Sequence, residues 1–525
     1  MVAGVELPIN RFASAQDMAE LIFGDGVTVT NASYTGDQDS SGIYTDGDSI
    51  APEVTPGDTG VMFSTGDLRG FTNNNSSESN QSGGTTTASS GPNNVPDFNA
   101  EAGTSTFDAS YLDVEFETDA DVMTMNFVFA SEEFPEFANS QFQDFVGVWI
   151  NGSFVDLSVG DGDIDPGNLD PGSSPNLFID NTSDQFNTEM DGFTATLTLT
   201  IPVSSTGTNF IRIGIADVAD GNFDSTLLIA ANSVQTTLVA TDDSSTLFPT
   251  GSRTIDLLSN DVNTTGGTLS ISQINGTNVV ANSEVLLPSG QRIFVNGDGT
   301  ITVLGDGDVE DVSFTYEVSS TTGESDVGFV TLNSIPCFVA GTHILTERGD
   351  RLVETLRPGD LILTRDDGMQ PLRWIGRRTV PGTGDFAPVR IAAGTFGAHH
   401  ALSLSPLHRV LIRDALAELL FGDQEVLVAA RDLVNGHSVC REELAEVEYV
   451  HLLFDRHQVI MSEGLPTESF LPGPQMLDSF EADMVTEIYA LFPELDPKSF
   501  DGYSAAARQM LKPYEARVLS QQWVA

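Results

Sequence analysis

The chain has 525 residues and a formal net charge of -54, with 22 Lys and Arg against 76 Asp and Glu. A chain of this length is too long for one hydrophobic core, so we expect three or more domains. The negative charge repels phosphates and argues against nucleic acid as a partner. Two cysteines rule out a disulfide framework, and the absence of a run of 18 apolar residues rules out a membrane-spanning helix.

Charge and reactive side chains are unevenly distributed along the chain. Residues 1–336 contain 49 Asp and Glu and 5 Lys and Arg, whereas residues 337–525 contain 27 and 17. Both cysteines and all seven histidines lie in the second part. The first two thirds of the chain therefore has no thiol or imidazole for catalysis, and any such chemistry is expected after residue 336.

The first 24 residues, MVAGVELPINRFASAQDMAELIFG, lack a charged leading segment, a long apolar run and a small-residue cleavage site. An acidic surface resists salting out, which suits an extracellular or saline habitat, and it can capture Ca²⁺. We therefore expect an extracellular or cell-surface protein that is exported by a route without an N-terminal signal peptide.

The first region begins with an amphipathic helix at 14–22, started by Ser14 or Asp17, and a polar stretch at 71–95 expected to be a solvated loop or linker. From about Thr106 the apolar residues alternate with polar ones, and Asn-Gly, Asp-Gly and Pro-Gly turns separate the segments. This pattern predicts an antiparallel β-sandwich over residues 1–236.

Two segments of this region carry a family resemblance. FVFASEEFPEFANSQFQDFVGVWING at 127–152 and NFIRIGIADVADGNFDSTLLIAANSV at 209–234 resemble the bacterial surface domain called choice-of-anchor L. Residues 237–336 form a second β region, in which LLSNDV, NGDGT and FTYEV resemble cadherin-like or Ig-like domains. The resemblances imply two β-sandwich domains at the surface of a cell.

Short strands continue from Cys337 to about Pro474, and a tail of helical pattern follows at 475–525. In the tail, residues 478–492, 503–511 and 515–523 place apolar groups at helical spacing, so we expect helices that pack on a neighbour. The whole chain is thus predicted to be mainly β with a short helical tail.

The third region holds the parts that cleavage of a backbone amide needs. Cys337 follows Pro336 directly, so its sulfur can attack the preceding carbonyl through a five-membered ring and shift the acyl group from nitrogen to sulfur. A histidine within hydrogen-bond reach can then protonate the leaving nitrogen near neutral pH. Ser405 and His408 lie about 70 residues downstream, and a later strand carries histidine and aspartate as well.

These segments together resemble the Hint superfamily of hedgehog autoprocessing domains and inteins, most closely the bacterial subgroup opened by CFVAGT. The resemblance spans 337–470 with its motifs in family order, namely CFVAGTHILT, RWIGRR, SPLHRVLI and VEYVHLLFDRHQVIMSEGLPTESF. It implies that Cys337 is the nucleophile, that His408 contacts the scissile amide with Ser405 in the usual Thr position, and that Asp455 and His457 assist thioester chemistry.

Splicing is not expected, because inteins end in His-Asn before a nucleophile and the stretch MSEGLPTESFLPG has no Asn. The expected activity is a single-turnover cleavage of the Pro336–Cys337 bond that releases residues 1–336 or transfers them to water or an external nucleophile. No cofactor is required for this reaction. An alternative is an adhesin-type or calcium-binding protein, with a surface or matrix partner, whose Hint fold is inert.

Each of these residues also has a structural interpretation. Cys337 alone would be a small buried hydrophobe, His408 a strand histidine, and Asp455 and His457 partners of Arg456 or Arg409. The remaining candidates are expected to be structural or exposed, and the spacing of Cys440 and His437 matches no zinc pattern. These remaining residues are Cys440, His399, His400, His437 and His451.

Calcium is the one metal that the sequence suggests. Alternating carboxylates at Asp161, Asp163, Asp165 and Asp170 lie on one expected turn, where hard oxygens can converge on a cation. A solvated acidic loop is the alternative, and the spacing is not that of an EF-hand. A second acidic group falls in the two choice-of-anchor L segments and comprises Glu132, Glu133, Asp217, Asp220 and Asp224. A calcium-dependent carbohydrate binder would depend on these groups alone.

Overall fold

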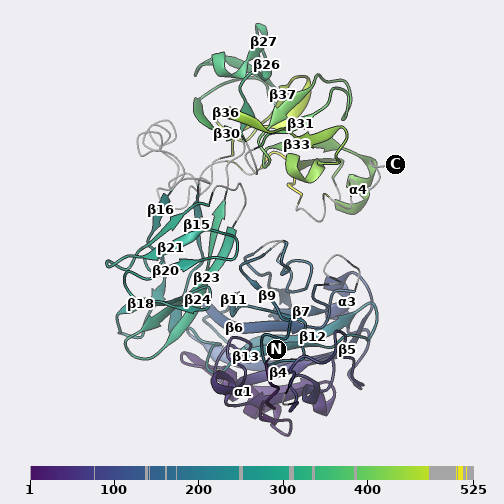
Figure 1. The fold of residues 1–525 in the computed structure, drawn as a ribbon, viewed down its shortest axis with the longest axis vertical. Coiled ribbons are helices and arrows are strands. Elements are labelled where there is room, and N and C mark those ends of the chain that lie inside the picture. Colours follow the sequence, from purple (N-terminus) through teal and green to yellow (C-terminus); the bar gives the residue numbers. More distant parts are fainter. Residues whose placement is uncertain are drawn as a thin grey trace. The chain divides into compact units, whose positions relative to one another are not determined.

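The computed structural model confirms that the protein is mainly β (Figure 1). Its four described α-helices have only four to eight residues each. The structure describes residues 2–75, 77–135, 137, 140, 142–159, 162–172, 174–247, 252–306, 312–333, 337–382, 387–421, 423–471, 504, 506–511, 516 and 519. Within these residues no helix is both long and apolar enough to cross a membrane.

The chain divides into two compact units, which are described separately here. The first comprises Met1–Asp243, Thr254–Thr302 and Val312–Thr331, and the second comprises Ser244–Arg253, Val303–Asp311 and Leu332–Ala525. The three-part β organisation expected at 1–236, 237–336 and 337–474 is a finer division than these units, and it stays a prediction.

Two sheets form the N-terminal sandwich. The larger follows the order β1-β3-β4-β13-β6-β10-β9 with β11 beside β6, and the smaller follows β2-β5-β12-β7-β8. The strands of the larger sheet are β1 (Ile9–Asn10), β3 (Ser41–Tyr44), β4 (Gly60–Ser64), β6 (Val122–Ser131), β9 (Phe178–Asp180), β10 (Gly192–Thr194), β11 (Leu197–Pro202) and β13 (Ser225–Ala230). Those of the smaller are β2 (Val27–Thr35), β5 (Thr106–Thr118), β7 (Phe145–Ile150), β8 (Ser153–Phe154) and β12 (Asn209–Val218).

The alternation in the sequence accounts for the core of this sandwich. Leu112, Val114 and Phe116 of β5 lie two residues apart, so they share one face of the strand, and all three are buried. They join Phe127 and Phe129 of β6 in one apolar cluster. Helix α1 (Ala15–Ile22) buries its apolar face in the same cluster. The expected N-cap is confirmed, since Ser14 and Asp17 form a reciprocal capping box.

Residues 71–95 contain no strand or helix among those described, as expected, but they are not a free linker. Their polar groups bind carboxylates of the sandwich. Ser79 N donates to Asp184 Oδ1 over 3.0 Å, and Thr87 N donates to Asp224 Oδ1 over 3.0 Å. Backbone N–H groups of this loop therefore donate hydrogen bonds to carboxylates of the sandwich. Helix α3 (Pro96–Ala102) follows this loop directly, and helix α2 (Gly47–Ile50) lies earlier, between β3 and β4.

The second β region also forms two sheets. One follows β15-β24-β23-β18-β19 and the other β16-β22-β21-β20, with a separate pair β14-β17. Tyr316 and Phe314 of β23 are fully buried. The strands are β14 (Leu238–Val239), β15 (Asp243–Thr246), β16 (Ser252–Ile255), β17 (Val262–Asn263), β18 (Leu269–Ile274), β19 (Thr277–Asn278), β20 (Glu284–Leu286), β21 (Arg292–Val295), β22 (Ile301–Leu304), β23 (Val312–Ser320) and β24 (Ser325–Asn333).

The third β region has a sheet of order β30-β36-β25-β32-β31-β35 and another of order β27-β26-β28-β37-β38-β33-β34, with β29 beside β28. Helix α4 (Ala415–Phe421) joins β33 to β34. The strands are β25 (Phe338–Val339), β26 (His343–Thr346), β27 (Gly349–Leu352), β28 (Leu361–Thr364), β29 (Gly368–Pro371), β30 (Trp374–Gly382), β31 (Val389–Ile391), β32 (Leu402–Leu404), β33 (Arg409–Arg413), β34 (Glu425–Ala429), β35 (Val439–Arg441), β36 (Leu444–Leu453), β37 (Val459–Ser462) and β38 (Leu465–Glu468).

The helical prediction for the tail is partly wrong. Met510 forms a parallel bridge with Leu427 of β34, and residues 506–511 contain no helix. Backbone pairing beside β34 has overridden the helical spacing of this segment. Ala516 and Leu519 are helical and buried, as expected. The helix predicted at 478–492 lies outside the described residues.

Candidate functional site

Cys337 stands at the entrance to the third β region, directly before β25. Strand β25 pairs with β36 through Phe338–Val450 and with β32 through Phe338–Leu404, so the start of the domain is held between two strands. The Cys337 side chain is 8% exposed. The expected scissile partner, Pro336, lies outside the described residues.

Ser405 engages the backbone on the Cys337 side of the expected cleavage point. Cys337 N donates to Ser405 Oγ over 2.7 Å, and Ser405 N donates to the Cys337 carbonyl over 3.0 Å. The hydroxyl thus accepts the hydrogen of the amide nitrogen that would become the leaving group. The two bonds hold the backbone N–H and C=O of Cys337, on either side of its Cα, which is the kind of positioning that an intramolecular attack requires.

His451 is the imidazole nearest to the sulfur. Its Nε2 lies 3.4 Å from Cys337 Sγ, and its side chain is buried on β36. The sequence analysis placed His451 among the structural or exposed residues, so its position beside the thiol was missed. No local pattern marks this position, because it depends on the pairing of β36 with β25. His451 lies two residues after Tyr449, so it shares the strand face of the residue that packs on Cys337.

His408 is fully buried and packs against Phe338, with ring centroids 4.2 Å apart and the rings tilted by 59°. A turn brings it next to Ser405, because His408 N donates to the Ser405 carbonyl over 3.1 Å. Within the described residues neither ring nitrogen of His408 has a hydrogen-bond partner. Burial lowers the pKa of His408 to about 4, so the ring is neutral near neutral pH and offers one N–H and one lone pair.

Glu468 is a further buried ionisable group that the sequence analysis did not single out. Arg409 N donates to Glu468 Oε1 over 2.8 Å, and Arg409 Nη1 lies 3.5 Å from the same oxygen. Burial acts to raise the pKa of Glu468, but the charge of Arg409 and a hydrogen bond from His457 hold it below its usual value. Glu468 is therefore a buried carboxylate whose charge also acts on His408.

His457 lies deeper in this cluster and has no described contact with Cys337. Its Nε2 is 3.1 Å from the Ser469 carbonyl and 3.5 Å from Glu468 Oε2. Asp455 is more than half exposed and pairs with Arg373 over 3.3 Å. The assisting roles expected for Asp455 and His457 stay predictions, and direct contact with the thiol is described for neither.

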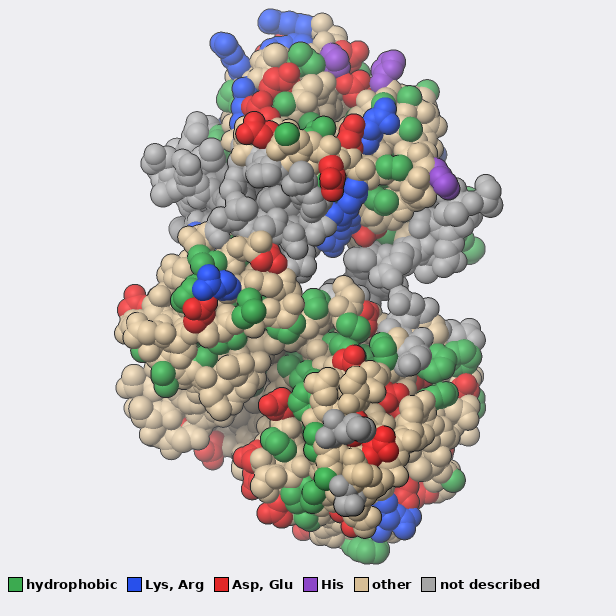
Figure 2. Space-filling view, in the orientation of Figure 1, with side chains coloured by type: hydrophobic (Ala, Val, Ile, Leu, Met, Phe, Trp, Pro, Cys, Tyr) green, Lys and Arg blue, Asp and Glu red, His purple; other side chains and the backbone are tan. Residues whose placement is uncertain are grey.

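The second cysteine and the remaining histidines, which were expected to be structural or exposed, are scattered. His343 pairs with Glu463, His399 contacts the carbonyl of His400, and Cys440 Sγ lies 3.6 Å from the carbonyl of His437. In the face drawn in Figure 2, purple histidine side chains lie at the surface of the part that holds β26 and α4. None of these contacts forms a zinc-like group.

The acidic turn at 161–170 binds its own backbone. Asp165 Oδ1 accepts from Gly167 N and Asn168 N over 2.8 and 2.9 Å, and Asp170 Oδ1 accepts from Gly172 N. Asp163 is also described, whereas Asp161 lies outside the described residues. Across the described part of the chain, no three His, Cys, Asp or Glu side chains are grouped so that they could hold a metal ion. Calcium binding at this turn stays a prediction.

Glu133 and Asp217, two members of the second acidic group predicted from the sequence, are buried inside the N-terminal sandwich together with Asp144. Glu133, Asp144 and Asp217 are at most 4% exposed. Glu133 Oε2 accepts from Asp144 N over 2.7 Å, and Asp144 Oδ1 accepts from Val218 N over 3.2 Å. Asp144 Oδ2 and Asp217 Oδ1 have no hydrogen-bond partner in the described residues. Burial and the neighbouring carboxylates raise the pKa of Glu133 to about 10 and that of Asp217 well above its usual value, and burial raises that of Asp144 to about 8.

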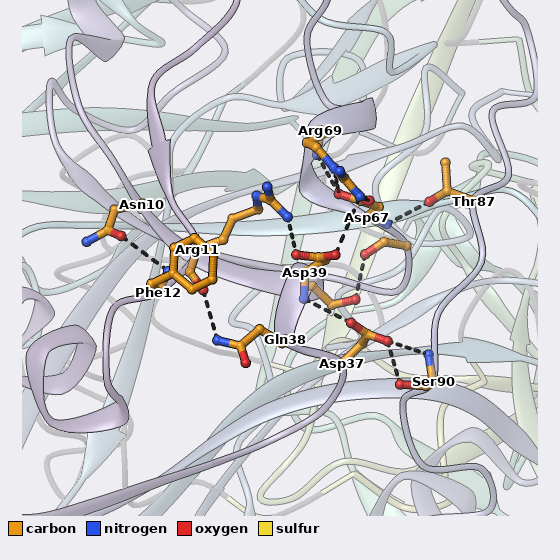
Figure 3. A network of polar contacts seen from close by, with 12 residues as sticks. Asn10, Arg11, Phe12, Asp37, Gln38, Asp39, Asp67, Arg69, Thr87 and Ser90 are labelled. Carbon is orange, nitrogen blue, oxygen red and sulfur yellow. Dashed lines mark hydrogen bonds and ion pairs between the residues drawn. The ribbon is translucent and has the colours of Figure 1, made fainter.

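The basic residues of the sandwich are used elsewhere. Residues 1–236 contain three arginines and no lysine. Arg11 pairs with Asp39 and Arg69 with Asp67 in a polar network near the surface (Figure 3). The third, Arg212, pairs with Asp113 over 2.8 Å. The buried carboxylates therefore lie in a domain whose basic side chains pair with other acids.

Comparisons with known proteins match the two ends of the chain. Residues 9–235 match a family model described as Choice-of-anchor L domain, and residues 336–474 match one described as Hint domain. No curated protein matches the chain. The resemblance of residues 240–333 to cadherin-like or Ig-like domains stays a prediction.

Among solved structures, the gp41-1 intein is 13% identical with a TM-score of 0.17 and covers 26% of this chain and 98% of its own. The MchDnaB-1 intein is 14% identical with a TM-score of 0.18 and covers 25% and 98%. The M60 catalytic domain with the CBM51-1 and CBM51-2 domains of Clostridium perfringens ZmpB is 9% identical with a TM-score of 0.14 and covers 85% and 43%. TM-scores this low carry no further argument. By the family matches, the chain is identified as one with an N-terminal Choice-of-anchor L domain and a C-terminal Hint domain.

Proposed function

We propose that the Hint domain cleaves the chain before Cys337 and that the N-terminal β domains are the segment it releases or transfers. The observation that carries this proposal is the pair of contacts at Cys337. Its backbone N–H donates a hydrogen bond to Ser405 Oγ over 2.7 Å, and its sulfur lies 3.4 Å from His451 Nε2. A nucleophile, a base and a bonded leaving nitrogen therefore meet at one residue.

In the first step, His451 accepts the thiol proton and Cys337 Sγ attacks the carbonyl carbon of Pro336. The carbon–sulfur bond forms, the carbon–nitrogen bond breaks, and the proton is delivered to the nitrogen of Cys337, which becomes a free amine. A thiol has an ordinary pKa near 8.5 and an imidazole near 6.5, so a close imidazole can share this proton near neutral pH. Ser405 holds the nitrogen in place while its bonding changes.

His408 acts in this scheme as a neutral group. Its pKa of about 4 means that it carries no spare proton at neutral pH, but its single N–H can still donate to the reacting amide. The ring packs against Phe338, the residue after the proposed nucleophile, which keeps it beside the reacting backbone.

The thioester is then resolved by water or by an external nucleophile. Attack at the carbonyl carbon of Pro336 breaks the carbon–sulfur bond, returns the thiol of Cys337 and leaves residues 1–336 as an acid or as an adduct. Because the late part of the domain lacks an Asn for cyclisation, the two fragments are not rejoined. We place the protein outside the cell or at its surface, in keeping with the Choice-of-anchor L match.

The test is thiol-induced cleavage of the purified full chain. Dithiothreitol or hydroxylamine should yield fragments of about 35 and 20 kDa, from the residues on either side of the cut. Cys337→Ala should abolish them, whereas Cys440→Ala, the matched thiol control, should cleave normally. His451→Gln should slow cleavage about 100-fold. A wild-type chain that stays intact under thiol for days would favour the inert-fold alternative.

A second candidate function is cation binding by the N-terminal sandwich. The observation that favours it is that Asp144 Oδ2 and Asp217 Oδ1 are buried without a partner among the described residues, in a domain whose arginines pair elsewhere. A divalent ion such as Ca²⁺ would neutralise them, although it would have to draw in further oxygens. Calorimetry with CaCl₂ should show binding that Asp144→Asn weakens. Absence of heat at millimolar Ca²⁺ would remove this candidate.

A further inference from the structure

A C-terminal segment beyond the matched Hint residues is docked on the Hint domain. We call the described residues Ser504 and Ala506–Leu511 the docked segment; the family match ends at residue 474. Leu427 N of β34 donates to the Gln509 carbonyl over 2.8 Å, and Leu511 N donates to the Leu427 carbonyl over 2.8 Å. The segment thus lies parallel to β34 at the edge of its sheet.

Side chains anchor the docked segment at both ends of this pairing. Arg508 Nη2 lies 2.8 Å from Asp366 Oδ1 and 3.0 Å from Glu425 Oε2, so one guanidinium bridges two carboxylates. Leu511 is 5% exposed and belongs to the main apolar cluster of the Hint domain. The tail is therefore held by backbone bonds, charge and apolar burial together.

The docked segment also engages His457 directly. His457 N donates to Ser504 Oγ over 2.8 Å, and Ala507 N donates to His457 Nδ1 over 2.9 Å. An imidazole nitrogen accepts a hydrogen bond only when it carries no proton. The backbone N–H of Ala507 therefore assigns the ring proton to Nε2, which faces the Ser469 carbonyl at 3.1 Å.

This assignment affects the buried charges beside the proposed site. With both ring nitrogens engaged in this way, His457 is neutral, and it faces Glu468 Oε2 at 3.5 Å without cancelling its charge. The negative charge of Glu468 acts to raise the pKa of His408, whereas a positive charge on His457 would act to lower it. A neutral His457 therefore leaves the negative charge of Glu468 to act on His408, the histidine next to Ser405, without an opposing positive charge.

We propose that the docked segment is a positioning element of the Hint site, in which the N–H of Ala507 holds His457 in its neutral Nε2–H form, so that no positive charge on that ring opposes the effect of Glu468 on His408. The effect on cleavage rests on the proposed function above, but the state of the His457 ring can be measured without any cleavage. A merely packing tail would stabilise the domain and leave that ring state unchanged.

The test uses the full chain labelled with ¹⁵N-histidine, with the ring signals of His457 assigned by His457→Gln. Ala507→Pro removes the N–H donor, and Ala507→Gly is the matched control that keeps it. The wild type and Ala507→Gly should show an unprotonated Nδ1 and a protonated Nε2. Ala507→Pro should show the other form or a mixture. An unchanged His457 signature in Ala507→Pro would overturn the proposal.

Cleavage rates provide a second test, and a milder variant controls for misfolding. In a wild type that cleaves under thiol, Ala507→Pro should slow cleavage about tenfold and Ala507→Gly less than twofold. Arg508→Gln, which loosens the anchor and keeps the N–H, should give a partial shift of the ring signal. A shifted ring with an unchanged rate would overturn the positioning role. A wild type that never cleaves would refute the proposed function, while the ring signals still decide the state of His457.

Discussion

The N-terminal sandwich and the Hint domain both bury carboxylates, but the charges around these carboxylates differ and shift their pKa values in opposite directions. In the Hint domain, Glu468 lies against Arg409 and His457, and its pKa is held below the usual value. In the sandwich, Asp144 and Asp217 face other acids, and their pKa values are raised. A buried carboxylate beside a cation can stay ionised, whereas one that faces other acids must hold a proton or bind a cation.

Composition explains the difference. Residues 1–336 have 5 basic side chains for 49 acidic ones, whereas residues 337–525 have 17 for 27, so the second part has more cations to pair with buried carboxylates.

Removing the cation from the Hint cluster should have the largest effect. Arg409→Met leaves Glu468 buried without its main partner, which should lower the free energy of unfolding of the Hint domain by about 3–5 kcal/mol. Urea unfolding followed by Trp374 fluorescence measures this loss. Arg456→Met is the control, because its pair with Asp367 is largely exposed and should contribute about 0–1 kcal/mol. Equal losses in the two variants would contradict the comparison.

Neutralising a sandwich carboxylate should have the opposite sign. Asp217→Asn removes the cost of keeping a proton on a buried carboxyl that has no basic partner, so at pH 8 without divalent cations it should stabilise the sandwich by about 1–3 kcal/mol. Trp149 fluorescence in a Trp374→Phe/Trp523→Phe background reports on this domain. The exposed Asp119→Asn should change little. Destabilisation by Asp217→Asn in the presence of chelator would show that the carboxylate has an unseen stabilising partner.

The two domains should also respond to pH in opposite directions. The pKa values of Asp144 and Asp224 are raised from 3.8 to about 8 and about 6, so their contribution is complete below about pH 4 and is lost as pH rises to 8. The pKa of Glu468 is lowered from 4.5, so its contribution is complete above that value and is lost as pH falls through the lowered pKa. Thermal melts between pH 4 and 9 should show the melting temperature of the sandwich falling across this window, whereas the contribution of Glu468 to the Hint domain stays complete above pH 4.5 and is lost only in more acidic solution. Parallel curves for both domains would refute the assignment.

Ser405 tests the positioning of the leaving nitrogen. Ser405→Ala removes the acceptor of the Cys337 N–H and should slow thiol-induced cleavage about tenfold, whereas Ser405→Thr keeps a hydroxyl and should stay close to the wild type. Gel quantification of the fragments over time measures both rates. Identical rates for the alanine and threonine variants would remove Ser405 from the site.

Asp455 should have the smallest effect. It is more than half exposed and its described ion pair is with Arg373, so Asp455→Asn should alter the cleavage rate less than twofold. A loss comparable to that of Ser405→Ala would restore the assisting role that the family resemblance implies.

Local patterns predicted much of this protein correctly. Alternating apolar residues predicted the mainly β fold, and Ser14 with Asp17 predicted the start of α1. The position of Cys337 after Pro336 and the spacing of Ser405 and His408 located the candidate site, since a turn of four residues brings a serine and a histidine together without help from distant segments.

Strand pairing decided what those patterns left open. His451 reaches the thiol because β36 lies beside β25, a neighbour more than a hundred residues away in sequence. The spacing of residues 503–511 favoured a helix, but an available edge at β34 gave their backbone other partners.

The residue types and short spacings thus indicated the mainly β architecture, the candidate nucleophile Cys337 and the shortage of cations in the first two thirds. Only the tertiary structure decided which imidazole meets the sulfur, which buried carboxylates have partners and where the tail lies. These depend on contacts between distant segments, and such contacts are set by how sheets pair and pack rather than by any local pattern.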